Sequence, residues 1–216
     1  RISTHMSWQV LEEDKSWEEQ MDKCLLNLSI VGTNFKKSYN SAAKSHNVSE
    51  LVLAKDLVLD YWSKSVHEAP RKTHLQPMFR NEVYERVMRG TFRDILDEQW
   101  YQGAPTSNYS TPKINADNRQ GVTPPPPDDT TSFLFLEQCC RMDLDGDGYL
   151  EPYIITFDSI SKQVVRIVVN CNSEKDIERV GAGKHKGKIL KIRENQYYTK
   201  YSFIPSPDGG IYDIGF

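Results

Sequence analysis

The chain has 216 residues, of which 38% are hydrophobic, and its 27 basic and 30 acidic side chains give a net charge of −3. This balance gives no general sign of a nucleic-acid binder, and the length allows one large domain or two small ones. No apolar stretch reaches the roughly 20 residues of a membrane span, and none follows Arg1 as in a signal peptide. The four cysteines show no CxxC spacing, so we expect reduced thiols in an intracellular protein.

Residues 7–29 are predicted to form one amphipathic helix with Ser7 as its N-cap. Apolar residues recur at helical spacing at Trp8, Leu11, Trp17, Met21, Cys24, Leu25 and Leu28. Two tryptophans on one stripe indicate core packing or a subunit contact. Strand composition follows in three segments, 30–39, 48–53 and 57–62. Within the first of them, Gly32 predicts a bulge or the close approach of another segment.

A second helix is predicted at 79–89, where an apolar stripe ends at Gly90. The stripe consists of Phe79, Val83, Val87 and Met88. Residues 102–130 lose all periodicity and are rich in Ser, Thr, Asn, Gly and Pro. Because the stretch includes the proline run 124–127, we expect an extended loop or linker there.

The remainder of the chain is predicted to be mostly antiparallel β-structure. Strand-like runs occur at 133–136, 153–157, 164–169, 189–192 and 197–203. The sequence thus predicts an α+β fold in three regions. They are an α+β region at 1–101, the linker at 102–130 and a β-rich region at 131–216.

An acidic, glycine-containing run lies between two of these strands. Its alternating carboxylates are Asp143, Asp145 and Asp147, and Gly148 permits the positive φ of a tight turn. Such oxygen-rich loops suit Ca²⁺, and Glu151 could add a ligand through water. An EF-hand would need a bidentate Glu where Ile154 stands. The favoured interpretation is a turn whose side chains bond their own backbone, and a Ca²⁺-binding β module is the alternative.

A basic run without acids spans residues 179–193. Its members are Arg179, Lys184, Lys186, Lys188, Lys191 and Arg193. Its glycines favour a solvated hairpin limb, and the alternative is a patch that contacts phosphates without reading bases. The run 181–188 fails the phosphate-loop spacing, because Ala182 stands where glycine is needed. Since no other catalytic signature occurs, we expect no enzyme and no required cofactor.

Three extended stretches, 17–39, 48–62 with 69–74 downstream, and 136–156, together resemble portal proteins of tailed double-stranded DNA bacteriophages. The third contains the run Arg-Met-Asp-Leu-Asp-Gly-Asp-Gly-Tyr-Leu-Glu-Pro-Tyr at 141–153. The resemblance covers most of residues 1–160 and is weaker beyond. It rests on extended segments and not on catalytic residues.

The resemblance implies a structural subunit of a ring of about twelve copies at one capsid vertex. Such a ring conducts double-stranded DNA during packaging and ejection and is not itself an ATPase. Implied partners are other copies, a terminase, the capsid protein, head–tail adaptor and tail proteins, and DNA bound without sequence preference. The implied location is the virion, after assembly in the host cytoplasm.

By the same resemblance, 1–101 corresponds largely to the wing and 131–216 to the clip or its approach. The six basic residues of 179–193 become candidates for the DNA channel. The chain departs from the family because it lacks a long helical tail and a pair of stem helices. It also begins with Arg1 and ends at Phe216, so we expect part of a longer chain.

Overall fold

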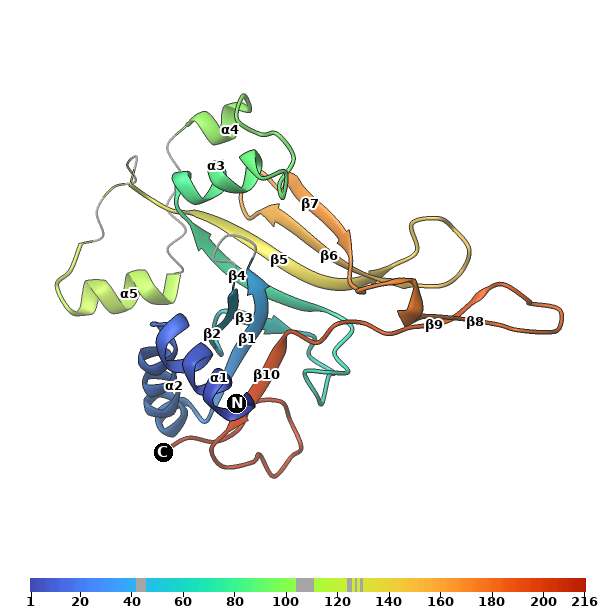
Figure 1. The fold of residues 1–216 in the computed structure, drawn as a ribbon. Coiled ribbons are helices and arrows are strands. Elements are labelled where there is room, and N and C mark those ends of the chain that lie inside the picture. Colours follow the sequence, from blue (N-terminus) through green and yellow to red (C-terminus); the bar gives the residue numbers. More distant parts are fainter. Residues whose placement is uncertain (42–45, 104–110, 124–125, 127, 129) are drawn as a thin grey trace. The chain divides into compact units, whose positions relative to one another are not determined.

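The computed structural model describes residues 1–41, 46–103, 111–123, 126, 128 and 130–216. Both helices and antiparallel sheets are present, which confirms the predicted α+β class (Figure 1). The chain forms two compact units and passes back and forth between them. Unit 1 comprises 1–73, 141–152 and 170–216, and unit 2 comprises 74–140 and 153–169.

The N-terminal helix of unit 1 is broken, so the prediction of one continuous helix at 7–29 is wrong. Helix α1 (Ile2–Trp8) continues as a short π-helix, η1 (Gln9–Glu13), and α2 (Trp17–Val31) starts afresh. At the break, the Asp14 carboxylate accepts hydrogen bonds from the Ser16 backbone N–H (3.3 Å) and hydroxyl (2.7 Å). This local bonding competes with helical continuation. Ser7 lies inside α1 and is not its cap.

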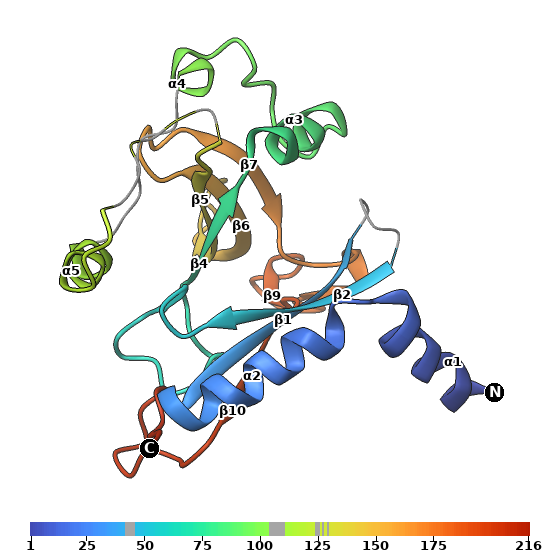
Figure 2. The same ribbon diagram turned by 90° about the vertical axis from the view of Figure 1, so that its left-hand side faces the viewer.

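The predicted apolar stripe is largely exposed on this broken helix. Neither α1 nor η1 has a buried residue, and Cys24 is the buried residue of α2. Trp8 is 50% exposed and Leu11 is 59% exposed. Figure 2 shows α2 alongside the strands against which it packs, while α1 leads away. The sequence had indicated either core packing or a subunit contact for this stripe, and core packing does not hold for Trp8 and Leu11.

The first sheet has the order β10-β1-β2, with β1 (Thr33–Ser41) in the centre. Its antiparallel neighbours are β2 (His46–Leu53) and β10 (Tyr198–Ser202). The strand starts later than predicted because α2 continues to Val31 and ends at Gly32, whose φ is +87°. A Cβ at Gly32 would lie 2.4 Å from the Asp213 carbonyl oxygen, which confirms the predicted close approach.

The second sheet has the order β3-β4-β5-β6-β7. Its strands are β3 (Leu57–Leu59), β4 (Lys72–Met78), β5 (Phe133–Met142), β6 (Glu151–Asp158) and β7 (Val164–Val169). Strand β4 was not predicted, because Pro77 within it is a residue that sheets usually exclude. Strands β6 and β7 pair antiparallel close to the predicted bounds, with a register shift after Thr156.

Unit 2 has an aromatic core. The core cluster comprises Met78, Val83, Phe92, Ile95, Tyr101, Phe133, Phe135 and Val165. Helix α3 (Arg80–Met88) contributes Val83 and confirms the predicted helix at 79–89. The Glu82 carboxylate accepts a hydrogen bond from the Phe79 N–H at 2.9 Å and so caps its start. Phe79 and Met88 are more than half exposed, so only part of the predicted stripe is core.

The stretch 102–130, predicted to be a loop, contains the end of α4 (Gln99–Gln102) and the whole of α5 (Thr111–Arg119). The sequence missed α5 because its polar composition lacks an apolar stripe. Residues 104–110, 124, 125, 127 and 129 of the predicted linker, including most of its proline run, lie outside the described residues.

Unit 1 also holds a two-stranded hairpin formed by β8 (Ile177–Arg179) and β9 (Ile189–Ile192), preceded by a 3-10 turn, η2 (Glu174–Asp176). In Figure 1 it is the narrow arm labelled β8 and β9. Within the part of the chain that the structure describes, no helix has the length and apolar character needed to cross a bilayer.

Candidate functional site

The predicted basic residues all lie on the hairpin, which we call the basic hairpin (residues 177–193). Arg179 ends β8, Lys191 lies in β9 and Arg193 follows it, while the connecting loop carries the other three, Lys184, Lys186 and Lys188. All six side chains are exposed. The six basic residues of the sequence run therefore all lie on one projecting hairpin.

Backbone bonds and glycines shape the tip of the basic hairpin. The Val180 N–H donates to the Lys188 carbonyl and the Gly187 N–H donates to the Val180 carbonyl, each at 2.9 Å. Gly183 and Gly187 have positive φ values of 92° and 88°, a conformation that a side chain would disfavour. Glycine therefore makes the turn, and the lysines between the glycines project from it.

The charges of the basic hairpin are not neutralised within the described residues. None of its six basic side chains forms an ion pair there, although the Arg179 guanidinium donates to the Gly187 carbonyl at 3.1 Å. The hairpin's single acid, Glu178, lies opposite Lys191 in the strand register. Six bases against one acid leave a positive surface that can attract a polyanion.

The hairpin is anchored at its base to the rest of unit 1. The Ile192 N–H donates to the Tyr149 hydroxyl at 3.0 Å, and the Arg193 N–H donates to the Asp176 carbonyl at 2.9 Å. Ile192 is buried. These contacts hold the strand ends and leave the tip exposed.

The acidic loop, residues 143–149, uses its carboxylates on its own backbone. Asp143 accepts hydrogen bonds from the N–H groups of Gly146 (2.7 Å) and Gly148 (3.0 Å). Asp145 accepts from the Asp147 N–H at 3.1 Å, and Asp147 accepts from the Tyr149 N–H at 2.7 Å. Gly146 and Gly148 have positive φ. The turn geometry favoured by the sequence is the one observed.

The same loop brings three possible cation ligands together. One carboxylate oxygen each of Asp143, Asp145 and Asp147 lie within 4.8 Å of one another. Glu151 lies in β6 and does not belong to this group. Ca²⁺ takes about six to eight oxygen ligands, so three carboxylates would supply only part of its shell. Those carboxylates are also already bonded to four backbone N–H groups, with which an ion would compete.

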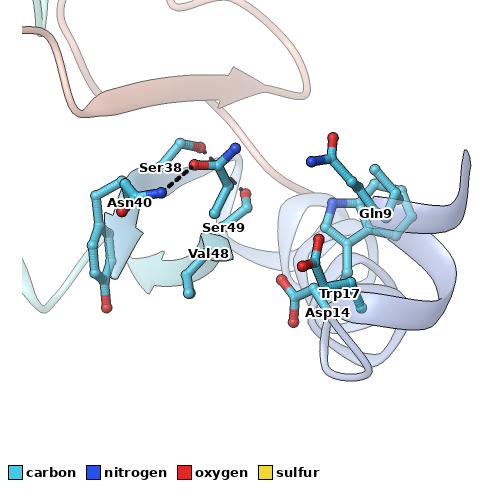
Figure 3. Close-up of a pocket in the computed structure, with 11 residues that line it drawn as sticks. Gln9, Asp14, Trp17, Ser38, Asn40, Val48 and Ser49 are labelled. Carbon is cyan, nitrogen blue, oxygen red and sulfur yellow. Dashed lines mark hydrogen bonds between the residues drawn. The ribbon is translucent and has the colours of Figure 1, made fainter. Parts of the chain in front are cut away.

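A pocket that the sequence did not predict lies between η1–α2 and strands β1–β2 of unit 1 (Figure 3). Its volume is about 420 Å³. The residues that line it are Gln9, Val10, Glu13, Asp14, Trp17, Ser38, Tyr39, Asn40, Asn47, Val48 and Ser49. They come from two stretches about twenty residues apart, so no local motif could reveal them. We call this cavity the acidic pocket, because its charged lining residues are Glu13 and Asp14.

A buried lysine lies close to Trp17, one of the residues that line the acidic pocket. Lys36 is 2% exposed, and its Nζ lies 5.2 Å from the centre of the Trp17 ring. Burial lowers the pKa of Lys36, while the nearby Cys24 and Asp14 act in the opposite direction. Burial likewise raises the pKa of the Cys24 thiol. All four cysteines are free, as the sequence predicted.

No family model matches the sequence, and no curated protein matches it.

Proposed function

We propose that this chain is a structural subunit of a phage portal ring, which forms the DNA channel at one capsid vertex. Three stretches of sequence, 17–39, 48–62 and 136–156, support this proposal by their resemblance to portal proteins. In this role the chain makes and breaks no covalent bonds. It guides DNA inward during packaging and outward during ejection, within a virion assembled in the host cytoplasm.

The basic hairpin is the observation that carries the proposal. Its six exposed bases and single acid present positive charge without ion pairs among the described residues. Lysine and arginine bind phosphates without reading base sequence, which a conduit for any genome requires. Repetition around a ring multiplies this modest charge into a continuous positive lining.

The exposed apolar side chains of α1 and η1 support assembly. Trp8 is 50% exposed and Leu11 is 59% exposed. Tryptophan is enriched in protein–protein interfaces, so these side chains are suited to a subunit contact. A ring needs head-to-tail contacts between different surfaces of adjacent copies. Docking of a terminase, head–tail adaptor and tail proteins, and the capsid protein belongs to the same proposal.

Electron microscopy and mass measurement of the full-length protein test the proposal. We expect closed rings with a central channel, of about twelve copies. A protein that stays monomeric at high concentration and low salt would overturn it.

A further inference from the structure

We propose that the acidic pocket of one copy binds the tip of the basic hairpin of a neighbouring copy. This inference rests on the proposed function in one respect, that copies of the chain assemble. It adds the surfaces that meet and the chemistry that joins them.

The pocket offers carboxylate oxygens to a cation. Asp14 is 6% exposed, and its Oδ1 accepts the two bonds from Ser16. The structure gives its other oxygen, Oδ2, no hydrogen bond from the described residues. Glu13 lines the same cavity, and no Lys, Arg or His is among the described residues that line it. A buried carboxylate near a cavity of this kind favours a positively charged occupant.

Aromatic rings and side-chain oxygens complete the lining. Trp17 and Tyr39 both face the cavity, and aromatic faces attract ammonium groups. The protein already uses this chemistry, since the Lys36 ammonium lies against the Trp17 ring. Figure 3 shows Asp14 and Trp17 on the helical side, across from Asn40 and Ser49 on the strands. A lysine ammonium has three donors, which carboxylate and amide oxygens can accept.

The tip of the basic hairpin has the complementary chemistry. Lys184, Lys186 and Lys188 are exposed and form no ion pair in the described chain, so a partner can engage all three. The glycines between them let the tip adapt its shape. A pocket of about 420 Å³ can hold one extended lysine side chain and leaves the others at its rim.

The two surfaces differ, so the contact is heterologous. Each copy that donates its hairpin keeps its own pocket free for the next copy, and such contacts close into rings or extend as filaments. Leu190, which is 62% exposed on the hairpin, and the exposed Trp8 and Leu11 supply apolar area for the same interface. The bases near the anchored end of the hairpin, Arg179, Lys191 and Arg193, remain outside the contact and available to DNA.

Two reversed variants of the full chain test the contact. The pocket variant carries Gln9→Lys and Glu13→Lys, which leaves the Asp14–Ser16 bonds in place. The hairpin variant carries Lys184→Glu, Lys186→Glu and Lys188→Glu. We expect each variant alone to associate at least about tenfold more weakly than the wild type in sedimentation velocity. Circular dichroism checks that both are folded.

Mixing the two variants gives the sharpest readout. The pocket variant has an intact hairpin and the hairpin variant has an intact pocket, and the two reversed surfaces are also opposite in charge. The mixture should therefore associate at least about tenfold more strongly than either variant alone. A control with the same charge change as the pocket variant, at two exposed residues that do not line the pocket, Glu68→Lys and Gln120→Lys, should assemble like the wild type. An equal loss of association in this control would overturn the proposed contact.

The outcomes separate this contact from the portal proposal. Normal assembly by both variants overturns the contact and leaves a portal ring possible through other surfaces. Recovery of association on mixing, together with open filaments in the wild type, supports the contact and contradicts the ring. A wild type that remains monomeric overturns both.

Discussion

The acidic loop and the tip of the basic hairpin both belong to unit 1. Each is a short, glycine-containing connection between two strands, and each is rich in one sign of charge. In the acidic loop, Asp143, Asp145 and Asp147 accept hydrogen bonds from the loop's own backbone N–H groups. In the hairpin, the tip lysines project into solvent, and the backbone closes the turn by itself. The carboxylates of the acidic loop therefore stabilise the fold, whereas the lysines of the hairpin tip are available to bind another molecule.

The largest expected effect is on DNA binding by the hairpin strands. Replacing Lys191 and Arg193 with Gln should weaken binding of a long DNA duplex about 10- to 100-fold and reduce the salt dependence of log K by about two. Fluorescence anisotropy over a series of salt concentrations measures both quantities. Lys191 and Arg193 lie outside the tip, so this experiment does not depend on the contact proposed between copies.

A matched control removes two bases elsewhere in unit 1. Lys15→Gln and Lys64→Gln change the net charge equally at exposed positions. We expect DNA affinity to change less than threefold in this control. Equal losses of DNA affinity in both double variants would mean that net charge, and not the hairpin, attracts DNA. The hairpin would then not be a specific binding element.

The elements that sequence predicted best are those whose signals are local. The helix at 79–89 and strands at 153–157, 164–169 and 189–192 were found within about one or two residues, because caps and apolar periodicity lie inside them. The break at Asp14 was missed because a single side chain competes with an apolar pattern that continues across it. Strand β4 was missed because Pro77 argues against a strand, and only its place in the sheet overrides that preference.

The candidate sites divide in the same way. The basic run and the acidic turn are contiguous in sequence, so their composition was sufficient to find them. The acidic pocket joins residues 9–17 to 38–49, and only the packing of α2 against β1 and β2 brings these segments together. The burial of Asp14 also depends on tertiary structure. In the sequence Asp14 directly follows Glu12 and Glu13, a run of acids that resembles an ordinary solvated helix face.

Asp213 is a buried carboxylate whose partners, unlike those of the acidic loop, include a lysine of a neighbouring strand. Its side chain is 4% exposed, pairs with the Lys200 ammonium at 2.7 Å and accepts the Ser206 N–H at 3.0 Å. Burial acts to raise the pKa of Asp213, but the hydrogen bonds from Lys200, Ser202 and Ser206 lower it overall. A carboxylate with a lowered folded-state pKa stabilises the protein above its unfolded pKa, and that contribution is lost as pH falls through the folded value.

Asp213→Asn should therefore reduce the free energy of unfolding by about 1 to 3 kcal/mol at pH 7. The difference from the wild type should begin to shrink near pH 4, where the carboxyl of the unfolded chain takes up a proton, and should shrink further as pH falls through the lowered pKa of the folded state. Urea unfolding at several pH values measures it. A deficit that stayed constant down to pH 2 would show that geometry, and not charge, accounts for the loss.

Removing a carboxylate from the acidic loop should destabilise the protein less than Asp213→Asn does. Asp143→Ala removes the acceptor of two backbone N–H groups, so we expect about 1 kcal/mol of destabilisation. Lys186→Ala at the hairpin tip should change the free energy of unfolding by less than about 0.5 kcal/mol. Urea denaturation of the two variants side by side measures both. Equal effects would remove the distinction between structural and available charge.

The smallest expected effect concerns Ca²⁺ and tests whether the acidic loop is only a turn. Its carboxylates already bond the backbone, so we expect no heat of binding in calorimetry up to about 1 mM Ca²⁺ and no stabilisation beyond that of an equal ionic strength of NaCl. Asp145→Asn should then be nearly silent, because an amide oxygen can still accept the bond from the Asp147 N–H. Saturable one-to-one heat in the wild type that disappears in Asp145→Asn would contradict this prediction. It would mean that the backbone bonds hold the three carboxylates in place for an ion, and that both charged loops have partners outside the chain.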